Sequence, residues 1–135
     1  KISFYDDYAH HPTEISSVLS GVEKVYKNKE IVCVFQPHRI SRVIRLKKEF
    51  SKCFKKADTV LLCPIYTANE KLRLNFTYHS FAKLIIKNSN VRLIQVEDEL
   101  QLQKFIKQNV FGKKIYIGMG AGSISNWMKN LKNIF

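Results

Sequence analysis

Glycine, proline and cysteine are all scarce in this 135-residue sequence, which has 5 Gly, 3 Pro and 3 Cys. So little glycine and proline excludes a collagen-like, low-complexity or intrinsically disordered chain. The odd number of cysteines and the absence of a C-x-x-C spacing argue against a disulfide framework and a zinc knuckle. Because Cys33 and Cys63 lie inside apolar runs, we expect both to be small core residues.

Long hydrophobic runs are missing as well. No segment approaches the roughly 20 apolar residues that a membrane-spanning helix needs, and no charged-then-apolar leader opens the sequence. We therefore expect a cytoplasmic protein without membrane insertion. The chain begins at Lys1 rather than at a methionine, so we also expect one domain cut from a longer protein.

Acidic residues are few: 11 Asp and Glu stand against 23 Lys and Arg, which gives a net charge of +12. This excess favours anionic partners, whether nucleotides, nucleic acids or acidic lipids. At 45% hydrophobic residues, the chain is long enough and apolar enough to fold as one domain, residues 1–135, around its own core.

Apolar residues alternate between strand-like runs and helix-like spacing along the whole chain. We expect strands at residues 2–5, 31–35, 59–65, 91–96 and 114–117. Apolar residues at intervals of three and four predict a helix after each strand, including one continuous helix over 40–54 and a loop through Asn75 before the next. This order predicts an α/β fold with a mostly parallel sheet of five to six strands and helices on both faces. Ligands of such sheets bind at the carboxyl ends of the strands.

The loop after the first expected strand carries two Asp and two His within six residues, at positions 6–11. These side chains could be metal ligands. Alternatively, the segment is a helix-capping turn, with Pro12 in the first turn and Glu14 close behind. A nucleotide also fits, because Asp7 can accept hydrogen bonds from ribose hydroxyls and Tyr8 offers a ring for stacking. A capping turn and a nucleotide site are compatible with each other.

The loop after the second expected strand places Arg39 and Arg42 three residues apart, in what we expect to be the first turn of a helix. Cations at a helix N-terminus oppose the helix dipole by about 0.3–1 kcal/mol each. A bound carboxylate or phosphate would reverse that effect, since it accepts hydrogen bonds from arginine and also faces the helix N-terminus. The alternative is a solvated basic face.

Other polar residues and glycines in the chain give a less specific functional signal. The glycines at 118–122 lack the spacing of a dinucleotide-binding loop and favour a close turn between strand and helix that can still line a site. Glu70 either orients a ligand or caps its loop. We expect His38 to brace its own loop and His79 to lie on a helix surface.

Four segments together resemble one known family. In chain order they are DDYAHHPTEI (6–15), VFQPHRISR (34–42), IYTANE (65–70) and GMGAGSI (118–124). They are similar to the C-terminal domain of the UDP-N-acetylmuramate:L-alanine ligases, a family of ATP-dependent Mur ligases of bacterial peptidoglycan synthesis. The resemblance spans nearly the whole chain and implies a Rossmann-like domain that closes over a central ATPase domain.

The resemblance also implies residue roles. His10, Arg39 and Arg42 would bind the amino acid, with both arginines on its carboxylate, and Asp7 and Tyr8 would meet the nucleotide. Candidates for lining the site, from the same loops, are His11, Tyr66, Glu70 and Gly120. No catalytic base is assigned and no metal ligand is expected in this chain.

The partners implied are L-alanine, ATP and UDP-N-acetylmuramate. ATP and Mg²⁺ would be held mainly by the central domain, because this chain contains no G-x-x-x-x-G-K-[ST] phosphate loop. We therefore expect the isolated chain to be inactive. Two alternatives stay open: a domain of the ligase that recycles murein tripeptide, and a basic nucleic-acid-binding module.

Overall fold

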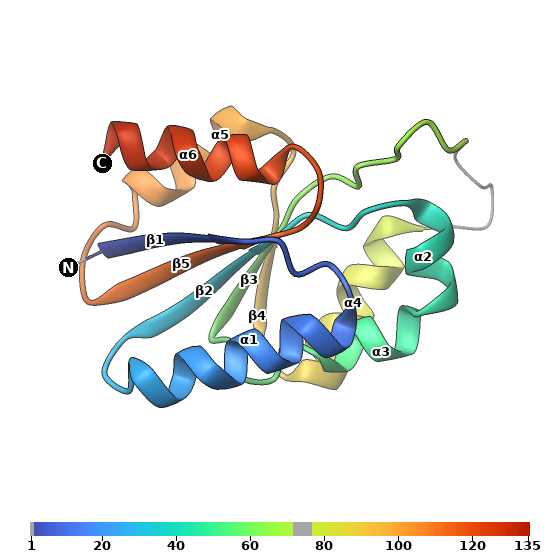
Figure 1. The fold of residues 1–135 in the computed structure, drawn as a ribbon, viewed down its shortest axis with the longest axis horizontal. Helices are drawn as coiled ribbons and strands as arrows, with labels where there is room; N and C mark the ends of the chain where they lie inside the picture. Colours follow the sequence, from blue (N-terminus) through green and yellow to red (C-terminus); the bar gives the residue numbers. More distant parts are fainter. Residues whose placement is uncertain (1, 72–76) are drawn as a thin grey trace.

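The computed structural model of the chain describes residues 2–71 and 77–135; the predicted loop position Asn75 lies outside them. Five parallel strands form one sheet in the order β1-β5-β2-β3-β4. The strands are β1 (Ile2–Asp7), β2 (Glu30–Phe35), β3 (Thr59–Leu62), β4 (Arg92–Gln95) and β5 (Lys114–Met119). The helices are α1 (Pro12–Val25), α2 (Ile40–Arg45), α3 (Lys47–Lys52), α4 (Tyr78–Ser89), α5 (Glu99–Lys107) and α6 (Ile124–Ile134). The predicted α/β Rossmann-like class is confirmed (Figure 1).

Helices cover both faces of the sheet, and each face has its own apolar core. Side chains of α1, α3 and α4 pack with one face, where Phe35, Phe50 and Phe81 are fully buried. Side chains of α5 and α6 pack with the other face around Leu102 and Met128. Figure 1 shows α5 and α6 together on one side of the strands and α1 on the other. The sheet is therefore the middle of three layers, with an apolar core on each face.

All three cysteines are buried and free, as expected for Cys33 and Cys63. Burial raises the pKa of the Cys63 thiol to about 12, so it stays protonated and unreactive. These cysteines serve as small apolar residues of the core.

The prediction of one helix over 40–54 is wrong, because the chain breaks between α2 and α3 at Leu46, where φ is −109° and ψ is 23°. The buried residues Val43 and Phe50 stay on compatible faces across the break, so the apolar period does not reveal it. The residue before α2 also differs from expectation. Arg39 has a φ of 71° and precedes the helix instead of lying in its first turn.

Parallel pairing places the carboxyl ends of all five strands at one edge of the sheet. The start of β1 and the end of α6 lie at the opposite end in Figure 1. The loops after β1, β2, β3 and β5 therefore share the edge where ligands of such sheets bind. Across residues 2–71 and 77–135, no helix combines the length and the apolar character needed to cross a bilayer.

Candidate functional site

The loop after β1 ends in a capped helix. The His11 ring accepts a hydrogen bond from the Thr13 backbone N–H at 3.3 Å, and Glu14 Oε1 accepts from the backbone N–H groups of His10 and His11 at 3.2 and 3.1 Å. Together these bonds form a capping box with Pro12 at the start of α1. The two backbone donors lower the pKa of the Glu14 carboxyl, so it stays ionised. The capping interpretation is confirmed, and His11 serves the helix.

The residues predicted to meet a nucleotide remain partly available. Asp7 Oδ1 accepts a hydrogen bond from the Ala9 backbone N–H at 2.9 Å, which shapes the loop and leaves the second carboxylate oxygen available to a ligand. Tyr8 is 70% exposed, and its ring meets His10 edge-on with centroids 5.5 Å apart. An exposed ring beside a carboxylate fits a nucleoside. In the part of the chain that the structure describes, no three His, Cys, Asp or Glu side chains gather to hold a metal ion.

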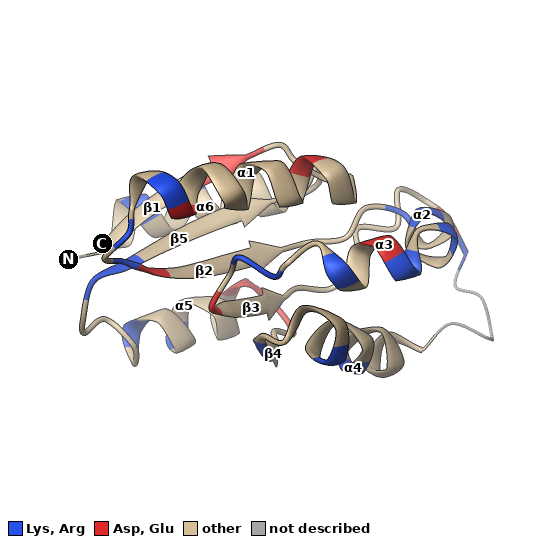
Figure 2. Ribbon diagram, turned by 90° about the horizontal axis from the view of Figure 1, so that it is seen from below, with Lys and Arg blue, Asp and Glu red and all other residues tan. Residues whose placement is uncertain are grey.

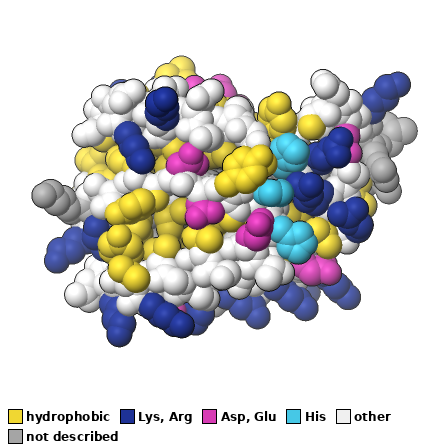
Figure 3. Space-filling view, in the orientation of Figure 1, with side chains coloured by type: hydrophobic (Ala, Val, Ile, Leu, Met, Phe, Trp, Pro, Cys, Tyr) yellow, Lys and Arg dark blue, Asp and Glu magenta, His cyan; other side chains and the backbone are white. Residues whose placement is uncertain are grey.

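Three aromatic side chains from three different loops meet at the edge of the sheet. The His38 ring stacks on Tyr66 with centroids 5.3 Å apart and planes 13° apart, and it meets the His10 ring at 6.2 Å. Arg42 Nη1 lies 3.3 Å from His38 Nδ1. On the face seen in Figure 3, histidine side chains gather beside Lys and Arg side chains. The fold thus unites His10, Arg42 and Tyr66 around His38.

Backbone hydrogen bonds fix the second and third loops to each other. The Arg39 N–H donates to the Tyr66 carbonyl and the Tyr66 N–H donates to the Pro37 carbonyl, both at 2.8 Å. These bonds continue the parallel pairing of β2 and β3 as a bridge between His38 and Tyr66. The hydrogen bond from its N–H ties Arg39 to the third loop, outside the ladder of α2.

Glu70 supplies the carboxylate at the N-terminus of α2. Its two oxygens accept hydrogen bonds from the Ser41 N–H at 3.0 Å and the Ser41 hydroxyl at 2.5 Å. Arg39 Nε lies 4.0 Å from Glu70 Oε2. The hydrogen bonds from Ser41, with the nearby Arg39 charge, lower the pKa of the Glu70 carboxyl. A side chain of the third loop therefore caps the N-terminus of α2, where we expected the helix to face a ligand, while Arg39 stays about half exposed.

The His38 environment disfavours its charged form. Burial lowers the pKa of His38, and Arg42, His10 and Arg39 lower it further, with Glu70 opposing them. A neutral imidazole therefore stands in the centre of the cluster. The expectation that His38 braces its loop is confirmed, but its position among the site residues was not anticipated.

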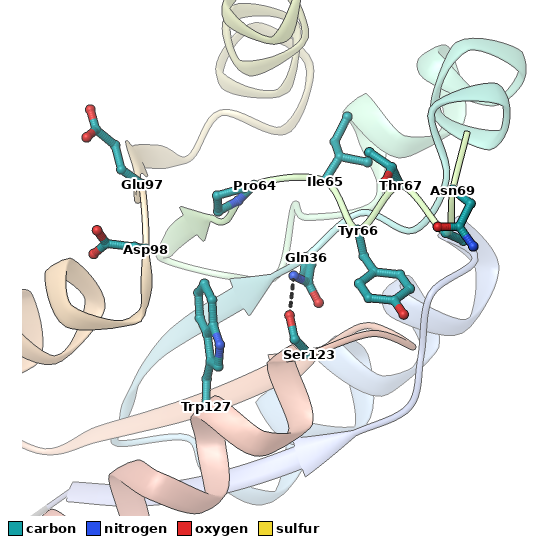
Figure 4. Close-up of a pocket in the computed structure, with 11 residues that line it drawn as sticks. Gln36, Pro64, Ile65, Tyr66, Thr67, Asn69, Glu97, Asp98, Ser123 and Trp127 are labelled. Atoms are coloured by element: carbon teal, nitrogen blue, oxygen red, sulfur yellow. Dashed lines mark hydrogen bonds between the residues drawn. The ribbon is translucent and has the colours of Figure 1, made fainter. Parts of the chain in front are cut away.

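A cleft of about 400 Å³ opens beside this cluster (Figure 4). Gln36 and Ser123 lie between the rings of Tyr66 and Trp127, and Asp98 lines the side toward α5. The buried Gln36 amide donates to Ser123 Oγ at 2.9 Å and accepts from the Ile124 N–H at 3.0 Å. Gln36 thus caps α6 and joins the second loop to the glycine segment.

The glycine segment is the close strand-to-helix turn that we expected. A Cβ on Gly120 would stand 2.7 Å from the Gln36 carbonyl oxygen, and its φ of 149° is one that other residues rarely adopt. A Cβ on Gly122 would stand 2.6 Å from the Tyr66 ring. These glycines let the turn approach the floor of the cleft.

Comparisons with known proteins agree on one family. Residues 1–122 match the family model described as Mur ligase, glutamate ligase domain. Over 98% of its length the chain is 66% identical to a UDP-N-acetylmuramate--L-alanine ligase of Pelagibacter ubique, and over 92% it is 40% identical to one of Brachyspira hyodysenteriae. It spans 28% and 27% of those two proteins, so about a quarter of their length.

Solved structures show the same arrangement. The chain aligns over 98% of its length with 26% of a UDP-N-acetylmuramate-alanine ligase from Thermotoga maritima, with a TM-score of 0.69 and 26% identity. A murein peptide ligase from Psychrobacter arcticus aligns over 98% of the chain and 27% of its own length, with a TM-score of 0.72 but only 16% identity. The second likeness shows the fold alone.

Proposed function

This chain belongs to the Mur ligase family, and we propose that it is the C-terminal, amino-acid-binding domain of a three-domain ligase that joins L-alanine to the carboxylate of UDP-N-acetylmuramate. The observation that carries the proposal is the gathering of His10, His38, Arg39 and Arg42 at the carboxyl edge of the sheet. An amino acid offers a carboxylate and an ammonium group, and this cluster offers cations and imidazoles to meet them.

The proposed reaction has two steps. ATP phosphorylates the carboxylate of UDP-N-acetylmuramate, and the amino group of L-alanine then attacks the acyl phosphate through a tetrahedral intermediate that expels phosphate. ATP and Mg²⁺ are held mainly by the central domain, which supplies the phosphoryl-transfer chemistry. Such an ATP-consuming enzyme works in the cytoplasm.

The first contribution of this chain is positioning. Arg39 and Arg42 hold the amino-acid carboxylate, while Tyr8 and Asp7 meet the nucleotide when the domains close. Tyr66 and the Gln36–Ser123 hydrogen bond support the cleft beside them. Holding the amine beside the acyl phosphate converts a bimolecular attack into a local one, which raises the rate without chemistry by these side chains.

The experiment that tests the proposal supplies the complete ligase with ATP, UDP-N-acetylmuramate and either L-alanine or murein tripeptide. We expect phosphate release and product with L-alanine. Product from the tripeptide alone would overturn the proposal in favour of a recycling ligase. The isolated chain serves as the negative control, since we expect it to hydrolyse no ATP.

A further inference from the structure

The two histidines that face each other in the site present different ring nitrogens to a ligand. His10 Nδ1 lies 3.0 Å from the backbone carbonyl oxygen of Tyr8. A carbonyl can only accept a hydrogen bond, so the Nδ1 of a neutral His10 carries the hydrogen. Its Nε2 then keeps an unshared electron pair, and no hydrogen bond to the described residues engages that atom.

His38 has the opposite arrangement. Its Nδ1 lies 3.3 Å from Nη1 of Arg42, and a guanidinium can only donate. The Nδ1 of His38 therefore accepts, and its Nε2 carries the hydrogen. Of the two rings, which lie 6.2 Å apart, only His10 can take a proton from a ligand without giving up an existing hydrogen bond.

The charges around the two rings reinforce this difference. Glu14 Oε1 lies 3.8 Å from His10 Nδ1, and its own backbone hydrogen bonds keep that carboxylate ionised, so a negative charge stands on the Nδ1 side of the ring. His38 faces Arg42 and Arg39, which disfavour a second positive charge there. A backbone carbonyl and a carboxylate behind Nδ1 orient His10 in the manner of a general base.

We propose that His10 is the catalytic base that activates the incoming amino acid, an inference that rests on the proposed ligase function. Nε2 of His10 takes one proton from the ammonium group of L-alanine. The electron pair freed on nitrogen forms the C–N bond to the acyl phosphate carbon. The C–O bond to phosphate then breaks from the tetrahedral intermediate, and the departing phosphate takes the second proton from the nitrogen, which leaves a neutral amide. The imidazolium, held by Glu14 and the Tyr8 carbonyl, then returns its proton to water.

The base has to act here because an amino acid is bound in its unreactive form. An ammonium group has no electron pair and cannot attack carbon. Arginines that bind the carboxylate also fix the ammonium group beside the His10–His38 pair, because its nitrogen is only two bonds from the carboxylate carbon. A base within that reach removes the proton at the moment when attack becomes possible.

The test compares two nucleophiles in the complete ligase carrying His10→Gln. Hydroxylamine is largely unprotonated near neutral pH, needs no base, and traps the acyl phosphate as a hydroxamate. We expect kcat with L-alanine to fall by about 10²–10⁴-fold, the usual contribution of a general base, while hydroxamate formation from ATP and UDP-N-acetylmuramate stays within about twofold of the wild type.

A control variant and a rescue experiment make the result specific. His79→Gln changes an exposed histidine near the start of α4 that makes no hydrogen bond, ion pair or ring contact with the described residues of the cluster, and it should leave both rates unchanged. In His10→Ala, added imidazole should restore part of the L-alanine rate, because it can occupy the space of the missing ring.

Three results would contradict either the role of His10 or the proposed ligase function. Unchanged kcat with a raised KM for L-alanine would make His10 a binding residue only and overturn the inference. Equal loss of the alanine and hydroxylamine reactions would assign His10 to acyl phosphate formation and also overturn it. No hydroxamate from the wild type would contradict the proposed ligase function itself.

Discussion

Two arginines of the site differ in how firmly their neighbours hold them. Arg42 is anchored to His38 through a hydrogen bond, and His38 is in turn stacked on Tyr66. Arg39 has a longer contact, 4.0 Å to Glu70, and its side chain is 48% exposed. A ligand carboxylate can therefore recruit Arg39 with little reorganisation, whereas Arg42 is already in place.

We predict that Arg39→Ala in the complete ligase raises the KM for L-alanine far more than the KM for ATP. Losing a charge-assisted pair costs on the order of 2–5 kcal/mol where the pair is desolvated by domain closure. Steady-state kinetics with each substrate varied in turn would measure the two KM values. Arg45→Ala, an exposed arginine at the end of α2, is the matched control and should change neither. Equal increases in both KM values would contradict the assignment of Arg39.

At the scale of helices and strands, the sequence predicts what local patterns determine. Runs rich in apolar residues mark all five strands, and Pro12 with Glu14 marks the start of α1, because caps and apolar periods are set by neighbours in the chain. The break at Leu46 leaves no such pattern. No glycine or proline stands there, and the apolar residues keep their period across it.

The site is less predictable because distant residues complete it. Glu70 caps α2 through Ser41, 29 positions earlier, and Gln36 caps α6 next to Ser123, 87 positions later. Neither partner can be identified from local spacing. The sequence motifs identify His10, Arg39 and Arg42 as site residues. The central position of His38 and the place of Trp127 in the cleft follow only from the fold.

The turn between β5 and α6 gives a prediction about stability. Gly120→Ala places a Cβ 2.7 Å from the Gln36 carbonyl oxygen at a φ of 149°, so either the backbone shifts or the cap on α6 is lost. We expect destabilisation of at least about 1–3 kcal/mol, as for other overpacked sites, measured as a fall in the midpoint of chemical unfolding.

Gly21→Ala is the matched control for that substitution. Gly21 lies within α1, and the position that an added methyl group would occupy has open space around it, with nothing within 4 Å beyond the helix's own backbone. Alanine is favoured over glycine inside a helix, so this variant should be more stable than the wild type by about 0.5–1 kcal/mol. If both variants shifted stability in the same direction, close packing of the β5–α6 turn would not be the cause.

For the molecule as a whole, the shifted groups predict that acid destabilises the fold. The pKa of His38 is lowered in the folded state, so below about pH 6.5 the unfolded chain binds more protons there and stability falls. The pKa values of Glu14 and Glu70 are also lowered, and their contributions, present above the unfolded value of 4.5, are lost as the pH falls through their folded values. All three shifts act in the same direction.

Thermal unfolding measured as a function of pH would check this. We expect Tm to change little above neutrality, to fall first as the pH drops below about 6.5, and to fall again below 4.5. In His38→Gln the first fall should shrink, whereas His79→Gln should keep it. An unaltered first fall in His38→Gln would show that another group is responsible.

The net charge of +12 would suit a domain that binds nucleic acid. A nucleic-acid-binding surface concentrates its cations on one groove or stripe. Figure 2 shows Lys and Arg distributed over α1, α2, α3, α4 and α5 on opposite sides of the sheet. Few of them could therefore contact one duplex together.

We predict weak binding in a gel-shift experiment at low salt and none at moderate salt, because each lost phosphate contact reduces both affinity and its salt dependence. Tight binding whose affinity falls steeply with salt would instead assign the lysine excess to a nucleic-acid partner.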